Sequence, residues 1–322
     1  MMDLILGVEI GGTKLQLALG TPAGEILVSR QGRVDVAQGG EGIRAWLVRE
    51  IPAFIRAEAL SRGQVVAIGC GFGGPLDAAT GRVMRSNQIE GWQDFPIRAW
   101  FEETFGLPTT VDNDSNAAAW GEYRRGFGRG SQHFFYTNIG SGVGGGFVFD
   151  GKLYDGQGFG AGEIGHAYTA DWTSDAPGAV AEVESLCSGW AIERRLRTPG
   201  YIPEESALLA RFGDDLSAIT ARDLGEAARA GDAFALAEIG RVARSFGLAL
   251  VDVLCLTGVE RIAIGGGVAK LGEALLDPIR DAVREFEFVS NAGRYAVSAC
   301  ELGDEIVLVG AILRAGEKSA PS

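Results

Sequence analysis

An apolar run near the start of the chain passes directly into a glycine-rich loop. Residues 4–10 are apolar apart from Glu9, the loop is Gly11-Gly12-Thr13-Lys14, and residues 15–19 alternate in hydrophobicity. This pattern predicts two strands joined by a hairpin. The glycines let the backbone approach a ligand closely, while Thr13 and Lys14 add a hydroxyl and a positive charge. The loop therefore favours a phosphate ligand, although an ordinary hairpin turn would have the same composition.

The spacing of this loop differs from the two common nucleotide-binding motifs. Neither the G-x-x-x-x-G-K-[ST] pattern nor G-x-G-x-x-G is present, and a strand rather than a helix is expected after the loop. The inference of a phosphate site at this loop therefore needs a second signal elsewhere in the chain.

The second half of the chain repeats the same arrangement. A predicted strand at 134–137 leads into the turn Gly140-Ser141-Gly142, and a returning strand follows at 145–149. Two such glycine tips suggest a clasp for the phosphates of a nucleotide. A third cluster, Gly265-Gly266-Gly267, follows a predicted strand at 261–264. It suits either a close approach to an adenine or ribose, or a tight turn from strand to helix.

Composition limits the classes of partner. The chain has 322 residues, 46% of them hydrophobic, and a formal net charge of −13. This length favours a globular protein of two domains. The acidic balance argues against binding to nucleic acid, which clustered Lys and Arg residues hold. A nucleotide ligand would then need local cations, loop amides and a divalent metal to overcome the unfavourable field.

The cysteines and the apolar segments bear on the compartment. The four cysteines are far apart and form no C-x-x-C pair, which predicts reduced thiols rather than disulfides or a zinc finger. The N-terminus lacks the basic region of a secretory signal, and the apolar stretch at 246–256 is too short to span a bilayer. We therefore expect a cytoplasmic protein without membrane association.

Alternating strand and helix patterns place the chain in the α/β class. Predicted strands beyond the two hairpins lie at 25–30, 65–70 and 109–111, and predicted helices at 42–60, 97–105, 179–197, 224–229, 234–256, 274–286 and 306–314.

Asp114 stands where a strand ends and an alanine-rich helix begins. Asn113 and Asn116 flank it, and the amides at a helix N-terminus keep a carboxylate ionised. An isolated Asp in this position is most often a helix cap. Beside two phosphate-binding tips it also suits a general base, because phosphoryl transfer needs a group that accepts the proton of the attacking hydroxyl.

Three further polar residues suit a sugar ligand. Glu163 and His166 lie within the segment Gly-Glu-Ile-Gly-His, and Glu184 precedes Ser188-Gly189. Carboxylate and imidazole groups together can accept and donate hydrogen bonds to neighbouring sugar hydroxyls.

These motifs, in this order, resemble those of the ROK family of sugar kinases and repressors over nearly the whole chain. The matching segments are Glu9-x-Gly11-Gly12-Thr13-Lys14, Gly71 to Asp77, Asn113-Asp114-x-Asn116, Gly140 to Gly146, Gly162 to His166, and Glu184 with Ser188-Gly189.

The resemblance implies a two-domain actin-like ATPase (ribonuclease H-like) fold with an interdomain active-site cleft. It further implies a smaller domain of residues 1–112 and 304–322, closed by the C-terminal helix, and a larger domain of residues 113–303. ATP would phosphorylate a hexose, in particular the 6-hydroxyl of glucose or a related sugar.

The same resemblance assigns roles by motif. Asp114 would be the catalytic base, and Glu9 would orient Mg²⁺ through water. The sugar would be held by Asn87, Asn113, Glu163, His166 and Glu184. The phosphates would be held by Gly11, Gly12, Thr13, Lys14, Thr137, Gly140, Ser141 and Gly142, and the adenosine by Gly265, Gly266 and Gly267.

The chain departs from the family pattern at two places. Glu9 stands where the family usually has Asp. This difference keeps the negative charge but places it on a longer side chain, which would affect the geometry of the metal and the rate of the reaction. Residues 167–183 contain no cysteine, whereas many members carry a cysteine zinc motif there, so we expect no structural zinc. No helix-turn-helix segment precedes Leu4, which favours the kinase branch.

Two alternatives remain at this level. The chain could be a catalytically weak sugar-binding sensor on the same scaffold, which the changes at Glu9 and the zinc motif suggest. Polyphosphate could replace ATP as donor, and the resemblance allows a homodimer.

Overall fold

The computed structural model describes residues 2–12, 14–59, 61–84, 89–158, 160–213 and 215–319. Two of the predicted site residues, Thr13 and Asn87, lie outside this part of the chain. The chain forms two compact units. The first comprises Met1–Gly130, Gly146–Ala161 and Glu301–Ser322, and the second comprises Ser131–Gly145 and Gly162–Cys300. We expected residues 113–303 to group together, but residues 113–130, 146–161 and 301–303 group with the first unit.

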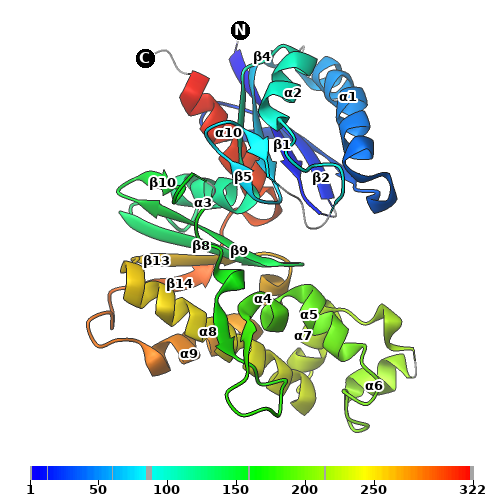
Figure 1. Cartoon of the computed structure of the whole chain (residues 1–322), viewed down its shortest axis with the longest axis vertical. Helices are drawn as coiled ribbons and strands as arrows, with labels where there is room; N and C mark the ends of the chain where they lie inside the picture. Colours follow the sequence, from blue (N-terminus) through cyan, green and yellow to red (C-terminus); the bar gives the residue numbers. More distant parts are fainter. Residues whose placement is uncertain are drawn as a thin grey trace. The chain divides into compact units, whose positions relative to one another are not determined.

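A five-stranded sheet lies at the centre of the first unit (Figure 1). Its strand order is β3 (Ile26–Arg33), β2 (Lys14–Gly20), β1 (Met2–Ile10), β4 (Gly63–Phe72) and β7 (Thr109–Asn113). Strands β1, β2 and β3 pair antiparallel, while β1, β4 and β7 run parallel. The predicted opening hairpin is confirmed, because β1 and β2 pair from Ile5↔Gly20 to Ile10↔Leu15.

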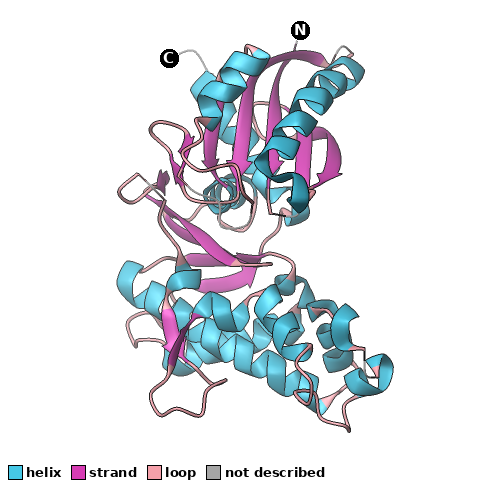
Figure 2. Ribbon diagram, turned by 45° about the vertical axis from the view of Figure 1, so that its right-hand side comes forward, coloured by secondary structure: helices cyan, strands magenta, loops and turns pink. Residues whose placement is uncertain are grey.

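Helices cover both faces of this sheet. Leu4, Leu6 and Val8 point to one core, which includes residues of α1 (Gly39–Glu58) and α2 (Ile97–Phe105). Ile5 points to the opposite core, where Leu308 and Ile312 of α10 (Ile306–Ser319) pack. Figure 2 shows the sheet of this unit with helices on either side. The continuous apolar run of β1 is therefore explained by two buried faces.

Glycines let α10 pack closely on α3 (Asp114–Arg125) and on the sheet. A Cβ atom at Gly310 would lie 1.7 Å from the carbonyl oxygen of Ala117, and one at Gly69 would lie 2.0 Å from that of Ala311. Because neither contact has room for a methyl group, the C-terminal helix reaches its position only with glycine at these points.

Strands of the second half form another five-stranded sheet. Its order is β10 (Lys152–Tyr154), β9 (Val143–Phe149), β8 (His133–Ile139), β13 (Arg261–Gly265) and β14 (Ala296–Ala299). The division between the two units falls within β9, between Gly145 and Gly146. A separate two-stranded sheet pairs β11 (Tyr168–Ala170) with β12 (Val180–Glu182).

In the second unit the helices expected at 224–229, 234–256 and 274–286 are present, and the helix at 207–212 was not expected. The helices described there are α4 (Val183–Cys187), α5 (Gly189–Leu196), α6 (Ala207–Phe212), α7 (Ala221–Arg229), α8 (Ala233–Thr257) and α9 (Glu273–Phe286). The single helix predicted over 179–197 is wrong. That segment begins as strand β12 and then breaks at Ser188, whose extended backbone ends α4 and whose hydroxyl caps α5 at Ala191 N. No helix in the described ranges is both long and apolar enough to cross a membrane.

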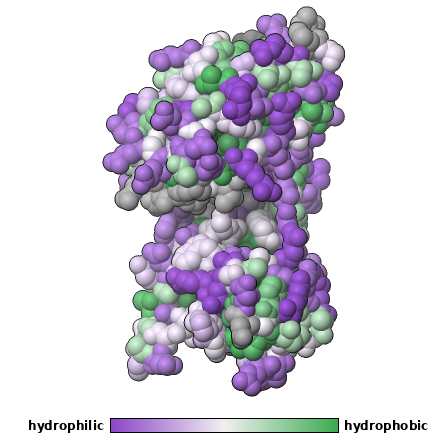
Figure 3. All heavy atoms as spheres, turned by 90° about the vertical axis from the view of Figure 1, so that its right-hand side faces the viewer, coloured by the Kyte–Doolittle hydropathy of each residue, from purple (hydrophilic) through white to green (hydrophobic). Residues whose placement is uncertain are grey.

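Small strands and short helices complete the fold. These are β5 (Leu76–Asp77), β6 (Arg82–Val83) and the 3₁₀ turns η1 (Val36–Gln38), η2 (Ile164–His166), η3 (Leu216–Ala218), η4 (Val268–Leu271) and η5 (Gly303–Glu305). Hydrophilic residues predominate on the face drawn in Figure 3, with hydrophobic residues scattered among them.

Candidate active site

The first glycine loop forms a tight turn at the end of β1. Gly11 N donates to Lys14 O at 3.0 Å. Lys14 Nζ lies 3.6 Å from Glu9 Oε2 and donates to Asp304 O at 3.2 Å. The Glu9 side chain is 13% exposed, and this burial raises its pKa from 4.5 to about 7, against the lowering effect of the Lys14 charge. The loop thus presents backbone, one cation and one largely buried carboxyl group.

Asp114 is the first residue of α3, and its neighbour caps the helix. Asn113 Oδ1 accepts hydrogen bonds from Ser115 N at 2.9 Å and Asn116 N at 3.2 Å, while its Nδ2 donates to Gly74 O. Asn113 is therefore the N-cap, a role that sequence reasoning had considered for Asp114. Asp114 Oδ1 accepts from Ser115 N at 2.7 Å. Its carboxylate lies at the N-terminus of α3, as expected.

Gly73 brings the first loop and Asp114 close to one another. A Cβ atom on Gly73 would lie 3.3 Å from Asp114 Oδ2 and 3.6 Å from Gly11 Cα, and Gly73 N donates to Ile10 O at 2.8 Å. These segments follow the carboxyl ends of β1, β4 and β7, the edge where open α/β sheets place ligands. The structure of the first unit thus groups Glu9, Gly11, Lys14 and Asp114 at one edge of its sheet.

The second glycine turn is held by backbone contacts with two other glycines. Gly140 N donates to Gly142 O at 2.8 Å, and Gly189 N donates to Gly140 O at 2.7 Å. Gly266 has a φ of +91°, and a Cβ atom there would lie 2.5 Å from Ile139 O. The turn between β8 and β9 is therefore fixed by the start of α5 and by the segment after β13.

The remaining predicted phosphate and adenosine residues differ in accessibility. Thr137 is fully buried, and its Oγ1 donates to Gly144 O at 2.8 Å within the hairpin. A Cβ atom at Gly265 would lie 2.6 Å from the hydroxyl of Tyr136. Gly267 has open space around its Cα. Of this third cluster, Gly265 and Gly266 serve close internal packing, and Gly267 has room beside it for a ligand.

The predicted sugar residues of the second unit gather around Val143. Glu184 Oε2 accepts from Val143 N at 2.7 Å. Gly165 packs so tightly that a Cβ atom there would lie 2.2 Å from Val143 O. Glu163 and His166, on either side of Gly165, have exposed side chains. Sequence reasoning missed Glu182, whose Oε2 lies 3.6 Å from His166 Nδ1.

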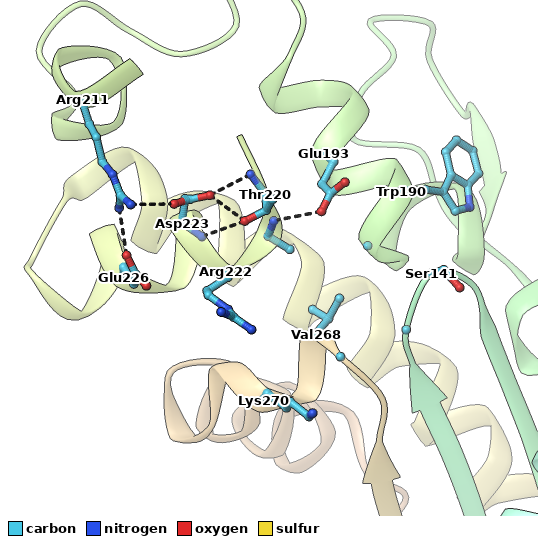
Figure 4. A pocket seen from close by; sticks show the side chains of 14 residues that line it. Ser141, Trp190, Glu193, Arg211, Thr220, Arg222, Asp223, Glu226, Val268 and Lys270 are labelled. Atoms are coloured by element: carbon cyan, nitrogen blue, oxygen red, sulfur yellow. Dashed lines mark hydrogen bonds and ion pairs between the residues drawn. The ribbon is translucent and has the colours of Figure 1, made fainter. Parts of the chain in front are cut away.

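A pocket of about 740 Å³ opens beside the second glycine turn in the second unit. Figure 4 shows Ser141 and Trp190 on one side, and Arg211, Asp223 and Glu226 on the other. Its lining comprises Gly140, Ser141, Gly189, Trp190, Glu193, Arg211, Thr220, Ala221, Arg222, Asp223, Glu226, Gly267, Val268 and Lys270. Three of the predicted ligand residues, Gly140, Ser141 and Gly267, are among them.

The wall of the pocket away from the glycine turn was not predicted. Thr220 and Asp223 form a capping box at the start of α7, with Thr220 N donating to Asp223 Oδ2 at 2.9 Å. Arg211 contacts Asp223 at 3.1 Å and Glu226 at 2.8 Å. The Thr-x-x-Asp spacing was a readable signal for the helix start, but no local pattern indicates that this helix lines a pocket.

Comparison with known proteins agrees with these motifs. A family model described as "ROK family" matches residues 5–317. A glucokinase of Halalkalibacterium halodurans is 33% identical over 95% of this chain and 92% of its own length. The crystal structure of a ROK family glucokinase from Streptomyces griseus, in complex with glucose and AMPPNP, has a TM-score of 0.81. That structure is 33% identical and covers 98% of this chain and 99% of its own.

Repressors also resemble this chain. A putative xylose repressor of a Caldicellulosiruptor species is 26% identical over 97% of this chain and 77% of its own length.

Proposed function

This chain belongs to the ROK family, and from that premise we propose that it transfers the terminal phosphoryl group of ATP to the 6-hydroxyl of glucose or a related hexose. It is a sugar kinase with the actin-like ATPase fold, as its glucokinase relatives and the Streptomyces griseus structure support. The proposal also covers the identity of the sugar, the residue that acts as general base and the metal ion.

The position of Asp114 carries the proposal. Its carboxylate is anchored by Ser115 N at 2.7 Å, next to Gly73 and on the same sheet edge as Lys14. In this role Asp114 accepts the proton of the sugar hydroxyl while the hydroxyl oxygen attacks the γ-phosphorus and the bond to the leaving ADP oxygen breaks. The hydrogen bond from the backbone amide fixes the orientation of the carboxylate at the start of α3.

We assign the nucleotide to the pocket beside Gly140 and Ser141. Backbone amides of a glycine turn suit phosphate oxygens, and Gly267 leaves room for the adenosine. Arg222 and Lys270 add positive charge to the lining, which a tri- or diphosphate needs in a protein of net charge −13. Gly11, Gly12 and Lys14 are assigned to the phosphates from the first unit.

We assign a magnesium ion to the surroundings of Glu9. Glu9 Oε2 is buried without a hydrogen-bond partner in the described chain, and carboxylate oxygens are ligands that Mg²⁺ prefers. Glu9 would hold the ion through water. Bound Mg²⁺ would neutralise the charge on the transferring phosphates. Lys14, 3.6 Å from Glu9, shares that task on the protein side.

The sugar is assigned to Glu163, His166 and Glu184 of the second unit, with Asn113 and Asn87. Glu163 and His166 are exposed and therefore accessible to a ligand. Glu184 already accepts one hydrogen bond from Val143 N, which fixes its carboxylate and leaves a second oxygen for a sugar hydroxyl.

Formation of the sugar phosphate, measured over a panel of hexoses with ATP or polyphosphate as donor, tests the proposal. Asp114→Asn should lower kcat about 100-fold or more, because it removes a general base. Asp150→Asn is a matched control. Asp150 is exposed with a φ of +50°, a conformation that Asn tolerates, so its activity should be unchanged. Near wild-type turnover of Asp114→Asn would contradict the base assignment.

The repressor relatives favour one second candidate, a sugar-binding sensor with weak catalysis. Calorimetric titration with the same hexoses distinguishes the two. A protein that binds a sugar but forms no sugar phosphate with either donor would be the sensor.

A further inference from the structure

The hairpin that follows His166 lacks the support of a larger sheet. Strands β11 and β12 pair only with each other in the described chain, from Tyr168↔Glu182 to Ala170↔Val180. Tyr168 and Val180 are 65% and 63% exposed. An isolated two-stranded hairpin is marginally stable in water, so this one needs an anchor elsewhere in the unit.

Trp172 supplies the contacts that the strands lack. Its Nε1 donates to Ser245 Oγ on α8 at 2.9 Å. The guanidinium carbons of Arg195 and Arg241 lie 4.7 Å and 5.2 Å from the centre of its ring. Residues 173–178, which complete the tip of the hairpin, are exposed. Trp172 therefore attaches the tip to α5 and α8.

A buried carboxylate fixes the two arginines that hold Trp172. Glu238 is fully buried and accepts from Arg195 Nε at 2.8 Å, Arg241 Nη2 at 2.7 Å and the Tyr201 hydroxyl at 2.8 Å. Nη1 and Nη2 of Arg195 are buried without a hydrogen-bond partner among the described residues. The face of the Trp172 ring offers the two guanidinium groups an electrostatic contact.

The hairpin connects this cluster with His166. Val183 N donates to Ala167 O at 2.9 Å, and β12 ends at Glu182, 3.6 Å from His166 Nδ1. A carboxylate near one ring nitrogen favours one orientation of an imidazole. Movement of the hairpin would move Glu182, and His166 would lose that constraint.

We propose that Trp172 is a positioning residue for the sugar site. By fixing the tip of the β11–β12 hairpin against α5 and α8, it holds Glu182 beside His166 and so orders His166 before the sugar binds. The inference rests on the proposed sugar site and adds a residue outside it.

Hydrogen exchange and kinetics of the full-length chain test this role. Trp172→Ala should accelerate exchange in residues 167–183 and leave that of β8 unchanged. It should raise the KM for the sugar about fivefold, equivalent to roughly 1 kcal/mol of lost pre-organisation, with kcat and the KM for ATP within twofold of the wild type. Val180→Thr, an isosteric change at an exposed hairpin position, is the control.

Two milder variants test the same role in case Trp172→Ala fails to fold. Trp172→Phe keeps a ring for the arginines, and Ser245→Ala removes only the acceptor of Nε1, so each should give a smaller rise in the KM for the sugar. Unchanged exchange in residues 167–183 of Trp172→Ala overturns the anchor. Faster exchange with an unchanged KM for the sugar overturns the positioning role. Absence of ADP release by the wild-type protein with every sugar overturns the proposed function instead, and this is known before any variant is made.

Discussion

Glu9 on β1 and Gln16 on β2 lie directly opposite one another in the antiparallel pair. Directly opposite residues share one face of a sheet, with Cβ atoms about 5 Å apart. Gln16 is fully buried, and both polar atoms of its amide lack a hydrogen-bond partner within the described chain. A buried amide thus stands beside the carboxyl group that we assign to magnesium.

The unpartnered amide predicts a stabilising substitution. Gln16→Leu should raise the free energy of unfolding by about 1 kcal/mol or more, because a buried polar group without a partner costs about 1–3 kcal/mol. Urea unfolding measures the change. Gln31→Leu, opposite Gln16 on β3 but exposed, should be nearly neutral. A loss of stability above 1 kcal/mol in Gln16→Leu would show that the amide has a partner, such as a buried water.

The raised pKa of Glu9 predicts how stability depends on pH without metal. Between its ordinary pKa of 4.5 and its folded value of about 7, the folded state binds the proton more tightly than the unfolded state. The free energy of unfolding should therefore fall as pH rises through this window, by at most about 3 kcal/mol. Glu9→Gln should remove this loss. The test is urea unfolding at pH 5 and pH 8 in EDTA; equal losses in both proteins would refute it.

Gly310 should tolerate no side chain. Gly310→Ala places a methyl carbon 1.7 Å from Ala117 O, and the backbone of α3 must move to relieve the clash. We expect a loss of about 3 kcal/mol or more by thermal or urea unfolding. Gly240→Ala, on α8 with open space around it, should gain up to about 1 kcal/mol from higher helix propensity. Similar effects of both changes would contradict the close crossing of α3 and α10.

The capping box at α7 should matter to nucleotide binding. Thr220→Ala removes the cap of a helix that lines the pocket, and such a cap is worth about 1 kcal/mol. If nucleotide binding loses a similar free energy, the KM for ATP should rise about fivefold. The KM for the sugar should not change. Asp215→Ala removes the cap of the 3₁₀ turn η3, which lies outside the pocket lining, and should lower stability alone. Equal KM values for ATP in both variants would separate α7 from the nucleotide site.

Local signals were enough to predict most elements. The helix at 97–105 was predicted with its observed bounds, because apolar periodicity fills it and Gly106, at a φ of +67°, ends it. The opening hairpin was equally clear. The segment 179–197 was not, since its apolar content masked the Ser188-Gly189 break, which was itself a readable cap signal.

Contacts between distant segments could not be predicted from the same signals. No sequence pattern shows that Glu184 accepts from Val143 N, 41 residues away, or that Arg211 and Asp223 line one pocket wall. The sequence predicted the glycines of that pocket because their chemistry is local. The opposite wall depends on how α5, α6 and α7 pack, which is a property of the whole unit.

The arrangement of α10 has a consequence for biosynthesis. Strand β1 begins at Met2, yet one face of its sheet is covered by Leu308 and Ile312, which the ribosome adds some 300 residues later. Until then, Ile5 and its neighbours on that face remain open to solvent. Residues 162–300 of the second unit emerge earlier and form a continuous segment. The unit that is translated first should therefore be the last to complete its folding, and a nascent chain that stalls before residue 306 would expose an aggregation-prone sheet face.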